Sequence, residues 1–174
     1  MAKIIIGVMG PGNGASPQDC QNAFVLGQKI AQAGWVLLTG GRNEGVMDAA
    51  SRGAQQANGL VVGILPGSDT RFAQANSCTA LSEAVDIPII TGMGHARNVI
   101  NVLSSRVVIA CGMGLGTASE VALALKSDIP VILLSTDQGA EAFFRQVLGK
   151  EKGDRLLHRA ETPEGAIALV HPYL

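Results

Sequence analysis

Aromatic and charged residues are both scarce in this chain of 174 residues. Aromatics make up 3% of the sequence, and Asp, Glu, Lys and Arg together make up 16%. The net charge of −1 excludes a general binding surface for nucleic acid or for acidic membranes. No apolar run approaches the roughly 18 residues of a membrane-spanning helix, so no membrane partner is expected. Hydrophobic residues (47%) and 22 glycines dominate instead, and this composition suits helices that pack closely on a sheet through small side chains.

Cysteine is also rare, and its placement excludes two classes of protein. Cys20, Cys78 and Cys111 are odd in number and far apart, so neither a disulfide framework nor a metal site is expected. The apolar start of the sequence, residues 1–8, leads into a glycine-rich loop and is therefore too short to be a signal peptide. We therefore expect reduced thiols and a cytoplasmic location.

Short aliphatic runs alternate with stretches of helix-forming residues along the whole chain. Strands are predicted over residues 3–9, 35–38, 60–65, 86–91, 106–110 and 129–134, with a last strand or turn at 156–157. Helices are predicted between these runs, including one over residues 138–148 whose Phe143, Phe144 and Val147 are expected to face inward. Residues 67–84 are polar and mixed, which indicates a loop. Pro88 indicates an edge position for the fourth strand.

Such alternation implies parallel strand pairing and right-handed crossovers. The predicted fold is therefore α/β: a single Rossmann-like domain over residues 1–174, with a doubly wound parallel sheet and helices on both faces. In these sheets ligands bind at the carboxyl ends of the strands, where the strand order reverses. Four glycine-rich turns follow predicted strands, so they should gather on one rim; they cover residues 10–14, 40–45, 92–94 and 112–117.

The turn at residues 112–117 carries the strongest chemical signal. It joins a buried strand to a helix, and the free N–H groups and partial positive charge of a helix start suit a phosphate or another oxyanion. Thr117 adds a hydroxyl near the helix start, and Glu120 adds a carboxylate one turn later.

Two cofactors are excluded by the sequence. The glycine spacing at residues 10–14 does not match the dinucleotide fingerprint, so NAD binding is not expected. Pyridoxal phosphate and lysine decarboxylation need a lysine for the Schiff base. The lysines considered for that role fall away from the glycine turns: Lys3, Lys29, Lys126, Lys150 and Lys152.

Three segments together resemble one known family. The residues from Thr39 to Ala50 resemble the glycine motif of the lysine-decarboxylase-like, "Lonely Guy"-type Rossmann superfamily (SLOG). Arg97 with Asn98 resembles its Arg-Lys pair, and residues 112–120 resemble its Pro-Gly-Gly-x-Gly-Thr-x-x-Glu signature. In the cytokinin-activating members, a nucleoside 5′-monophosphate places its phosphate on the Gly-Thr turn. The resemblance then implies Arg97 and Glu120 as catalytic residues for N-glycosidic bond cleavage.

The chain departs from that signature at three positions. Gly112 replaces the proline, Met113 replaces the first signature glycine, and Asn98 replaces the lysine. These features look more like the branch that contains molybdenum cofactor carrier proteins. Their cargo is a pterin with a terminal phosphate and a metal oxo group, and a carrier tolerates the loss of catalytic partners.

The leading hypothesis is a carrier or storage protein for a phosphate-bearing cofactor, most simply the molybdenum cofactor, acting without turnover. The alternative is a nucleoside 5′-monophosphate phosphoribohydrolase, and a nucleotide sensor is a third hypothesis. Expected partners are homodimer or homotetramer copies and molybdoenzymes as recipients of cargo. The predicted binding residues are Gly10, Gly12, Gly40, Gly41, Arg42, Met93, Arg97, Asn98, Gly112, Met113, Gly114, Gly116, Thr117 and Glu120.

Several of these residues also have structural interpretations. Arg97 could form a salt bridge with Glu120 or Glu44, and Glu120 could be a buried carboxylate that accepts backbone N–H bonds. Arg42 could be a solvated loop residue or a rim cation. His95 is interpreted as a loop residue, and Cys111 as a small apolar strand residue.

Overall fold

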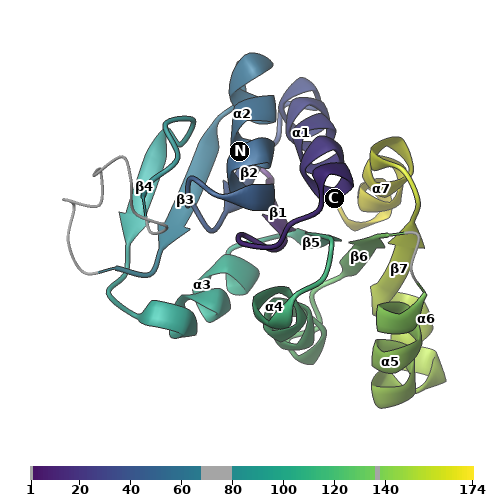
Figure 1. Cartoon of the computed structure of the whole chain (residues 1–174). Coiled ribbons are helices and arrows are strands. Elements are labelled where there is room, and N and C mark those ends of the chain that lie inside the picture. The colour runs from purple at the N-terminus through teal and green to yellow at the C-terminus, as the bar shows by residue number, and fades with distance from the viewer. Residues whose placement is uncertain (1, 68–79, 136–137) are drawn as a thin grey trace.

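All strands in the described part of the chain form one parallel sheet (Figure 1). The structure is a computed structural model and describes residues 2–67, 80–135 and 138–174. The strands lie in the order β4-β3-β2-β1-β5-β6-β7, which confirms the predicted parallel α/β fold. Their bounds are β1 Ile5–Met9, β2 Val36–Thr39, β3 Val61–Leu65, β4 Ile87–Ile90, β5 Val107–Cys111, β6 Val131–Leu134 and β7 Leu157–Ala160.

The strand order reverses next to β1. The chain proceeds outward from β1 to β4, then crosses back to place β5 on the other side of β1. Ile6 accordingly pairs with Leu37 of β2 on one side and with Val107 of β5 on the other. The switch point of this doubly wound sheet therefore lies between β1 and β5, where the fold favours a ligand site.

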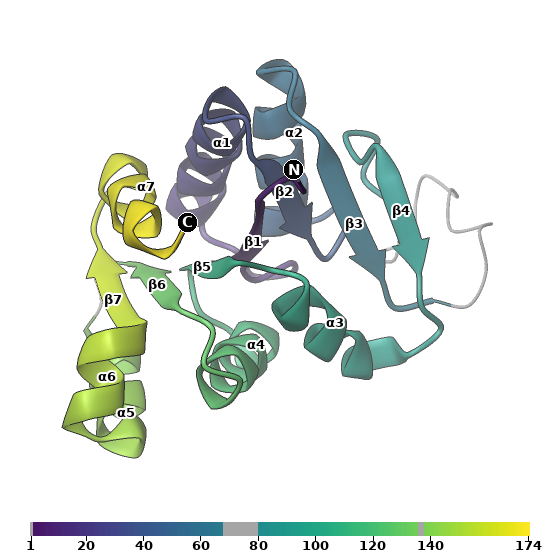
Figure 2. The ribbon, with the colours of Figure 1, turned by 180° about the vertical axis from the view of Figure 1, so that it is seen from behind.

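Helices cover both faces of the sheet (Figures 1 and 2). Helices α1, α2 and α7 lie on one face, and α3, α4, α5 and α6 lie on the other or at its edge. Each face has its own apolar cluster, one including Leu26 and Ala50 and the other including Val121 and Phe144. The helix bounds are α1 Pro17–Gln32, α2 Gly45–Gln56, α3 Asn98–Leu103, α4 Leu115–Lys126, α5 Gly139–Leu148, α6 Lys150–Leu156 and α7 Pro163–Val170, with short 3₁₀ helices η2 Gly94–Arg97 and η3 His171–Tyr173.

The sequence predicts helix starts at Ser16-Pro17 and at Thr162-Pro163, because each pairs a capping hydroxyl with a proline in the first turn, and the structure confirms both, in α1 and α7. The Ser16 hydroxyl accepts a hydrogen bond from the Asp19 N–H at 3.0 Å, and the Asp19 carboxylate accepts one from the Ser16 N–H. Pro17 follows as the first helical residue. In α7, the Thr162 hydroxyl accepts from the Gly165 N–H at 3.1 Å, with Pro163 in the first turn.

The carboxyl-terminal part differs from the prediction. The polar segment that becomes α6 has no helical apolar pattern, and the last strand extends over Leu157–Ala160 rather than stopping at residues 156–157. In α5, Phe144 is buried, but Phe143 and Val147 are exposed. The expectation that all three face inward was wrong, because α5 lies at the sheet edge and packs on one side only. Most of the loop predicted over residues 67–84 lies outside the described residues.

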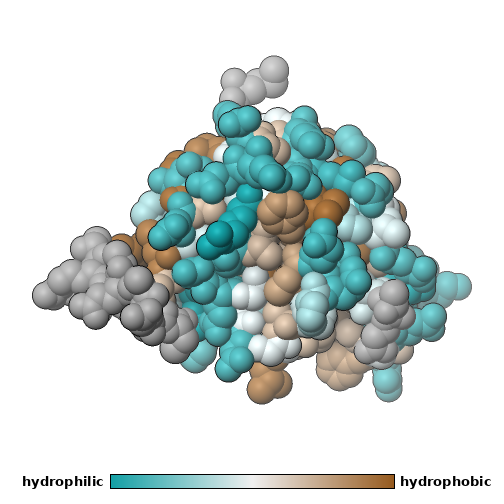
Figure 3. Space-filling model, turned by 45° about the horizontal axis from the view of Figure 1, so that its top comes forward, coloured by the Kyte–Doolittle hydropathy of each residue, from teal (hydrophilic) through white to brown (hydrophobic). Residues whose placement is uncertain are grey.

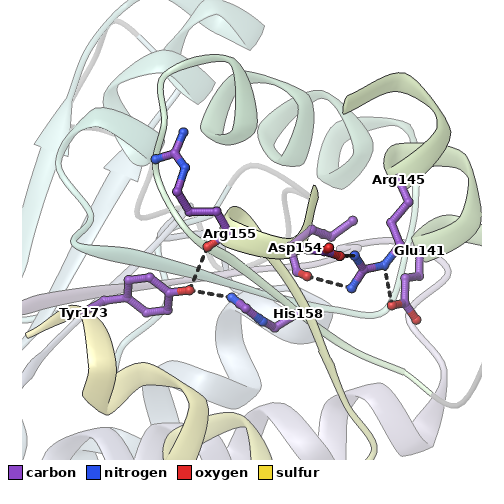
Figure 4. Close-up of polar contacts among 7 residues, drawn as sticks. Glu141, Arg145, Asp154, Arg155, His158 and Tyr173 are labelled. Carbon is purple, nitrogen blue, oxygen red and sulfur yellow. Dashed lines mark hydrogen bonds and ion pairs between the residues drawn. The ribbon is translucent and has the colours of Figure 1, made fainter. Parts of the chain in front are cut away.

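A polar cluster ties these last elements together (Figure 4). The Arg145 guanidinium contacts Glu141 of α5 at 2.9 Å, Asp154 of α6 at 3.1 Å and the Leu157 carbonyl of β7 at 3.0 Å. The Tyr173 hydroxyl hydrogen-bonds with His158 and donates to the Arg155 carbonyl. The sheet edge is thus fixed to α5, α6 and η3 by side chains rather than by further strands.

The outer surface of α1 and α2 is polar. Figure 3 turns this side forward and shows it as mostly hydrophilic, with separate hydrophobic patches. Helices in the described residues are all too short or too polar to cross a bilayer.

Helices α1 and α2 approach each other at backbone distance. A Cβ at Gly27 of α1 would overlap the Ala50 carbonyl and lie 2.8 Å from the Ala54 nitrogen, both in α2. The crossing therefore has no room for a side chain at this position.

We predict that Gly27→Ala destabilises the protein by about 1–3 kcal/mol, because overpacking outweighs the better helix propensity of alanine. Gly153→Ala is the matched control, since a Cβ there would meet its nearest atom at 3.6 Å. That variant should stay within about 1 kcal/mol of wild type in urea unfolding. Equal stability of the two variants would contradict the close crossing.

Candidate functional site

A cavity of about 240 Å³ opens at the carboxyl ends of β1, β2 and β5, at the switch point of the sheet. It is lined by residues from three of the four glycine-rich turns and by the 3₁₀ helix that follows the turn at residues 92–94. Ten of the predicted binding residues line it: Gly10, Gly12, Gly40, Arg42, Arg97, Asn98, Gly114, Gly116, Thr117 and Glu120.

The other four predicted residues do not line the cavity. Gly41 packs against Gly63 of β3, and Gly112 lies against the Asp19 carboxylate. Met93 and Met113 are both exposed.

Six lining residues were not among the predicted ones: Met9, Pro11, Asn13, Met47, His95 and Leu115. Most are sequence neighbours of predicted glycines, so the turns themselves were the available signal. Met47 could be found only from the orientation of α2.

The start of α4 faces this cavity without a cap. Its N-cap residue is Gly114, which makes no side-chain cap hydrogen bond. The first helical hydrogen bond runs from the Ala118 N–H to the Gly114 carbonyl at 2.8 Å. The N–H groups of residues 115–117 therefore have no acceptor within the helix. A Cβ at Gly116 would meet no atom within 4 Å, so the backbone is open to the cavity. Free N–H groups at a helix start are of the kind that suit an anionic ligand.

The Thr117 hydroxyl lies at the same helix start. Thr117 is 2% exposed, and its Oγ1 has no hydrogen-bond partner among the described residues. Buried hydroxyls in folded proteins are normally paired, because an unpaired one loses its hydration without replacement. This one lies at the cavity wall, where a ligand could supply the partner.

Arg97 brings a buried positive charge to the cavity. It is 9% exposed, and its Nη1 donates to the Ile64 carbonyl at 2.6 Å. A Cβ at Gly40 would lie 2.7 Å from the same Nη1, so only glycine at the end of β2 leaves room for the guanidinium. Burial lowers the pKa of Arg97, an effect that nearby Glu120 opposes and Arg42 reinforces. In the described residues Arg97 has no ion pair with Glu120 or Glu44, contrary to the salt-bridge alternatives.

Glu120 is the buried carboxylate of the site. It is 7% exposed, and its Oε1 accepts a hydrogen bond from the Asn101 amide at 2.7 Å. Burial raises the pKa of Glu120, while the Asn101 hydrogen bond and the Arg97 charge lower it in part. Its partner is thus a side chain of α3 rather than a backbone N–H.

Three further polar contacts involve residues of the cavity wall. Arg42 forms an ion pair with Glu44 at 2.7 Å, so it is held at the cavity rather than freely solvated. The Asn98 amide donates to the Ser119 hydroxyl at 2.7 Å, and Ser119 donates to the Gly116 carbonyl at 2.7 Å. Asn98 therefore links α3 to the first turn of α4.

Cys111 does not take part in the cavity wall. Its thiol donates to the Asp19 carbonyl at 3.2 Å, and burial raises its pKa to about 12. A thiol with so high a pKa is a poor source of thiolate, which agrees with the structural interpretation of this residue. Across the described residues, no group of three or more His, Cys, Asp or Glu side chains is placed to hold a metal ion.

Fold and cavity together define a Rossmann-like α/β protein with its pocket at the topological switch point. The model of the SLOG cluster4 family matches residues 3–167, so the chain belongs to that family.

Two solved structures are similar over nearly the whole chain. The molybdenum cofactor binding protein from the phototrophic bacterium Rippkaea orientalis is 54% identical, with 99% of this chain and 98% of that chain covered and a TM-score of 0.89. The molybdenum cofactor carrier protein from Chlamydomonas reinhardtii is 48% identical over the same shares, with a TM-score of 0.86. A protein of Archaeoglobus fulgidus is 45% identical over 121 residues, which cover 70% of this chain and 73% of that protein.

We predict that Thr117→Val raises the free energy of unfolding of the ligand-free protein by about 1 kcal/mol, because an isosteric apolar group replaces an unpaired buried hydroxyl. The matched variant Thr162→Val should lower it by about 1 kcal/mol, since that hydroxyl caps α7. Thermal and urea unfolding measure both. A loss of stability in Thr117→Val comparable with that in Thr162→Val would show that the Thr117 hydroxyl has a partner in the protein.

Proposed function

We propose that this protein binds and carries the molybdenum cofactor, with the phosphate of the cofactor at the start of α4. The unpaired Thr117 hydroxyl beside the uncapped N–H groups of α4 is the observation that carries the proposal. A phosphate oxygen there would accept from the hydroxyl and from the backbone. Arg97 and Arg42 supply positive charge to the same cavity.

The similarities support the choice of cargo. The two solved structures described above, at 54% and 48% identity, are a molybdenum cofactor binding protein and a molybdenum cofactor carrier protein. At these identities over 99% of the chain, the same class of ligand is the simplest inference for this protein.

The size of the cavity bears on how the cargo lies. Its volume of about 240 Å³ is below the roughly 300–1,000 Å³ that is typical of a small-molecule site. It suits the terminal phosphate and the groups next to it, so the pterin and the metal oxo group would lie at the mouth. The cofactor supplies the metal chemistry when it is bound, and the protein supplies anion binding and shielding.

The alternative, cleavage of a nucleoside 5′-monophosphate, would use Glu120 and Arg97. Both line the cavity, but Asn98 stands where the resemblance expects a lysine and is tied to Ser119. Arg97 is held by the Ile64 carbonyl rather than by Glu120. Burial also raises the pKa of Glu120 and so favours its protonated form, which is a poorer stabiliser of the positive charge that develops on the sugar.

The proposal is tested by cofactor binding and delivery. Under anaerobic conditions the wild type should retain molybdenum cofactor through gel filtration and restore activity to a cofactor-free molybdoenzyme. Arg97→Met should lower the affinity at least about tenfold, because a buried charge that contacts the ligand region is removed. Lys29→Met is the control, since it removes a positive charge that is paired with Glu164 on the surface.

Two outcomes would contradict the proposal. One is equal loss of cofactor binding in Arg97→Met and Lys29→Met. The other is release of adenine from adenosine 5′-monophosphate by the wild type but not by Glu120→Gln, which would establish the hydrolase instead.

We also propose that the protein works in the cytoplasm as a homodimer or homotetramer, with a second copy on the outer face of α3 and α4. Leu103 is 61% exposed and Leu115 is 94% exposed, and Val99 and Ala122 are exposed on the same two helices. Large apolar side chains exposed on two neighbouring helices are typical of a protein interface. Leu115 also lines the cavity, so this face borders the cargo site.

We predict that Leu103→Glu shifts the assembly towards monomer in sedimentation velocity, because a charge would be buried at the interface. Val147→Glu serves as the comparison, since Val147 is an exposed apolar residue on α5. A monomeric wild type, or dissociation by Val147→Glu alone, would show that α3 and α4 do not form the interface.

A further inference from the structure

Glu120 places a carboxylate in the same cavity as the anion-binding helix start. It lies one turn after Thr117 on α4, and both residues line the cavity of about 240 Å³. The hydrogen bond from the Asn101 amide occupies one carboxylate oxygen, Oε1. A cavity built for an anion would not be expected to contain a buried acid unless that acid has a role in binding.

The groups around Glu120 leave its charge incompletely balanced. The charged and titratable side chains of the cavity wall are Arg97 and His95 from η2 and Arg42 from the turn after β2. Arg97 donates to the Ile64 carbonyl, and Arg42 is paired with Glu44. From α3, Asn101 presents an uncharged amide, whose Oδ1 has no hydrogen-bond partner in the described residues. No contact ion pair therefore neutralises the carboxylate within that part of the chain.

We propose that Glu120 makes this site bind an oxyanion together with one proton, shared between the carboxyl group and the bound anion. The inference rests on the anion site proposed above. Two negative charges in one small cavity repel each other, and a proton between them turns the repulsion into a hydrogen bond. No other bond forms or breaks: the proton comes from solvent, or it arrives on the ligand.

The shared proton selects among ligands. Inorganic phosphate above neutral pH is still HPO₄²⁻, whose own hydroxyl can donate to an ionised Glu120. Sulfate carries no proton at these pH values, so its complex must take one up from solvent. A phosphate monoester dianion also lacks a proton and should behave like sulfate. The site therefore prefers phosphate to sulfate increasingly as pH rises.

Calorimetric titration with inorganic sulfate and with inorganic phosphate, from pH 5.5 to 9 at constant ionic strength, tests this. The sulfate association constant should fall by up to about tenfold per pH unit over part of the range, because one proton is bound with the anion. The sulfate association constant begins to fall at the pH where Glu120 of the unbound protein ionises. It stops falling above the pKa of Glu120 in the sulfate complex, which is higher because the bound anion disfavours the ionised carboxylate. The phosphate association constant should change less than about threefold above pH 7.5, because no further proton is needed.

Two variants separate Glu120 from other groups. Glu120→Gln keeps an oxygen to accept from Asn101 but cannot titrate, so both the sulfate slope and the rising preference for phosphate should disappear. His95→Gln should keep the slope above pH 7.5, because it removes the imidazole of the cavity wall and leaves the Glu120 carboxylate in place. Thermal unfolding of both variants confirms that they fold.

The outcomes are distinct. Sulfate binding that is equally strong at pH 6 and pH 9 in the wild type overturns the proton linkage alone, as does an unchanged slope in Glu120→Gln. Failure of both anions to bind at any pH overturns the anion site itself, and the linkage with it.

Discussion

The uncapped start of α4 at the switch point is the constraint on which the rest of the site depends. Its first N–H groups have no helical acceptor, and Gly114 offers no capping side chain. Because β5 lies next to β1, the turns after both strands meet at this point. The fold thus concentrates unpaired donors, including the Thr117 hydroxyl, where other proteins of this architecture bind their ligands.

Arg97 and Glu120 add one positive and one negative group to this cavity. Arg97 is buried next to the end of β2 because Gly40 leaves room for it, and burial lowers its pKa. Glu120 is buried one helical turn below the donors, and burial raises its pKa. A positive and a negative group are therefore kept near each other without a contact ion pair in the described residues. Each remains available to interact with a ligand rather than being neutralised by the other.

The departures from the superfamily signature have structural consequences that fit a binding protein. Asn98, in place of a lysine, is hydrogen-bonded to Ser119 and so fixes α3 to α4. Met113 is exposed and does not enter the cavity wall. Gly112 lies against the Asp19 carboxylate, at the start of α1. These substitutions remove a cation from the cavity and leave the start of α4 uncapped.

The sequence by itself determined the parallel α/β fold, the caps of α1 and α7, and the glycine turns that meet at the cavity. These features depend on local patterns: buried aliphatic runs, helix caps, and glycines directly after strands. The helix α6 was missed because its polar residues show no apolar period, and Phe143 and Val147 were misplaced because local pattern does not reveal a sheet edge. Tertiary structure alone decided that Met47 reaches the cavity, that Asn101 pairs with Glu120, and that Thr117 has no partner among the described residues. Such contacts join residues from different elements, so they exist only once the sheet has brought those elements together.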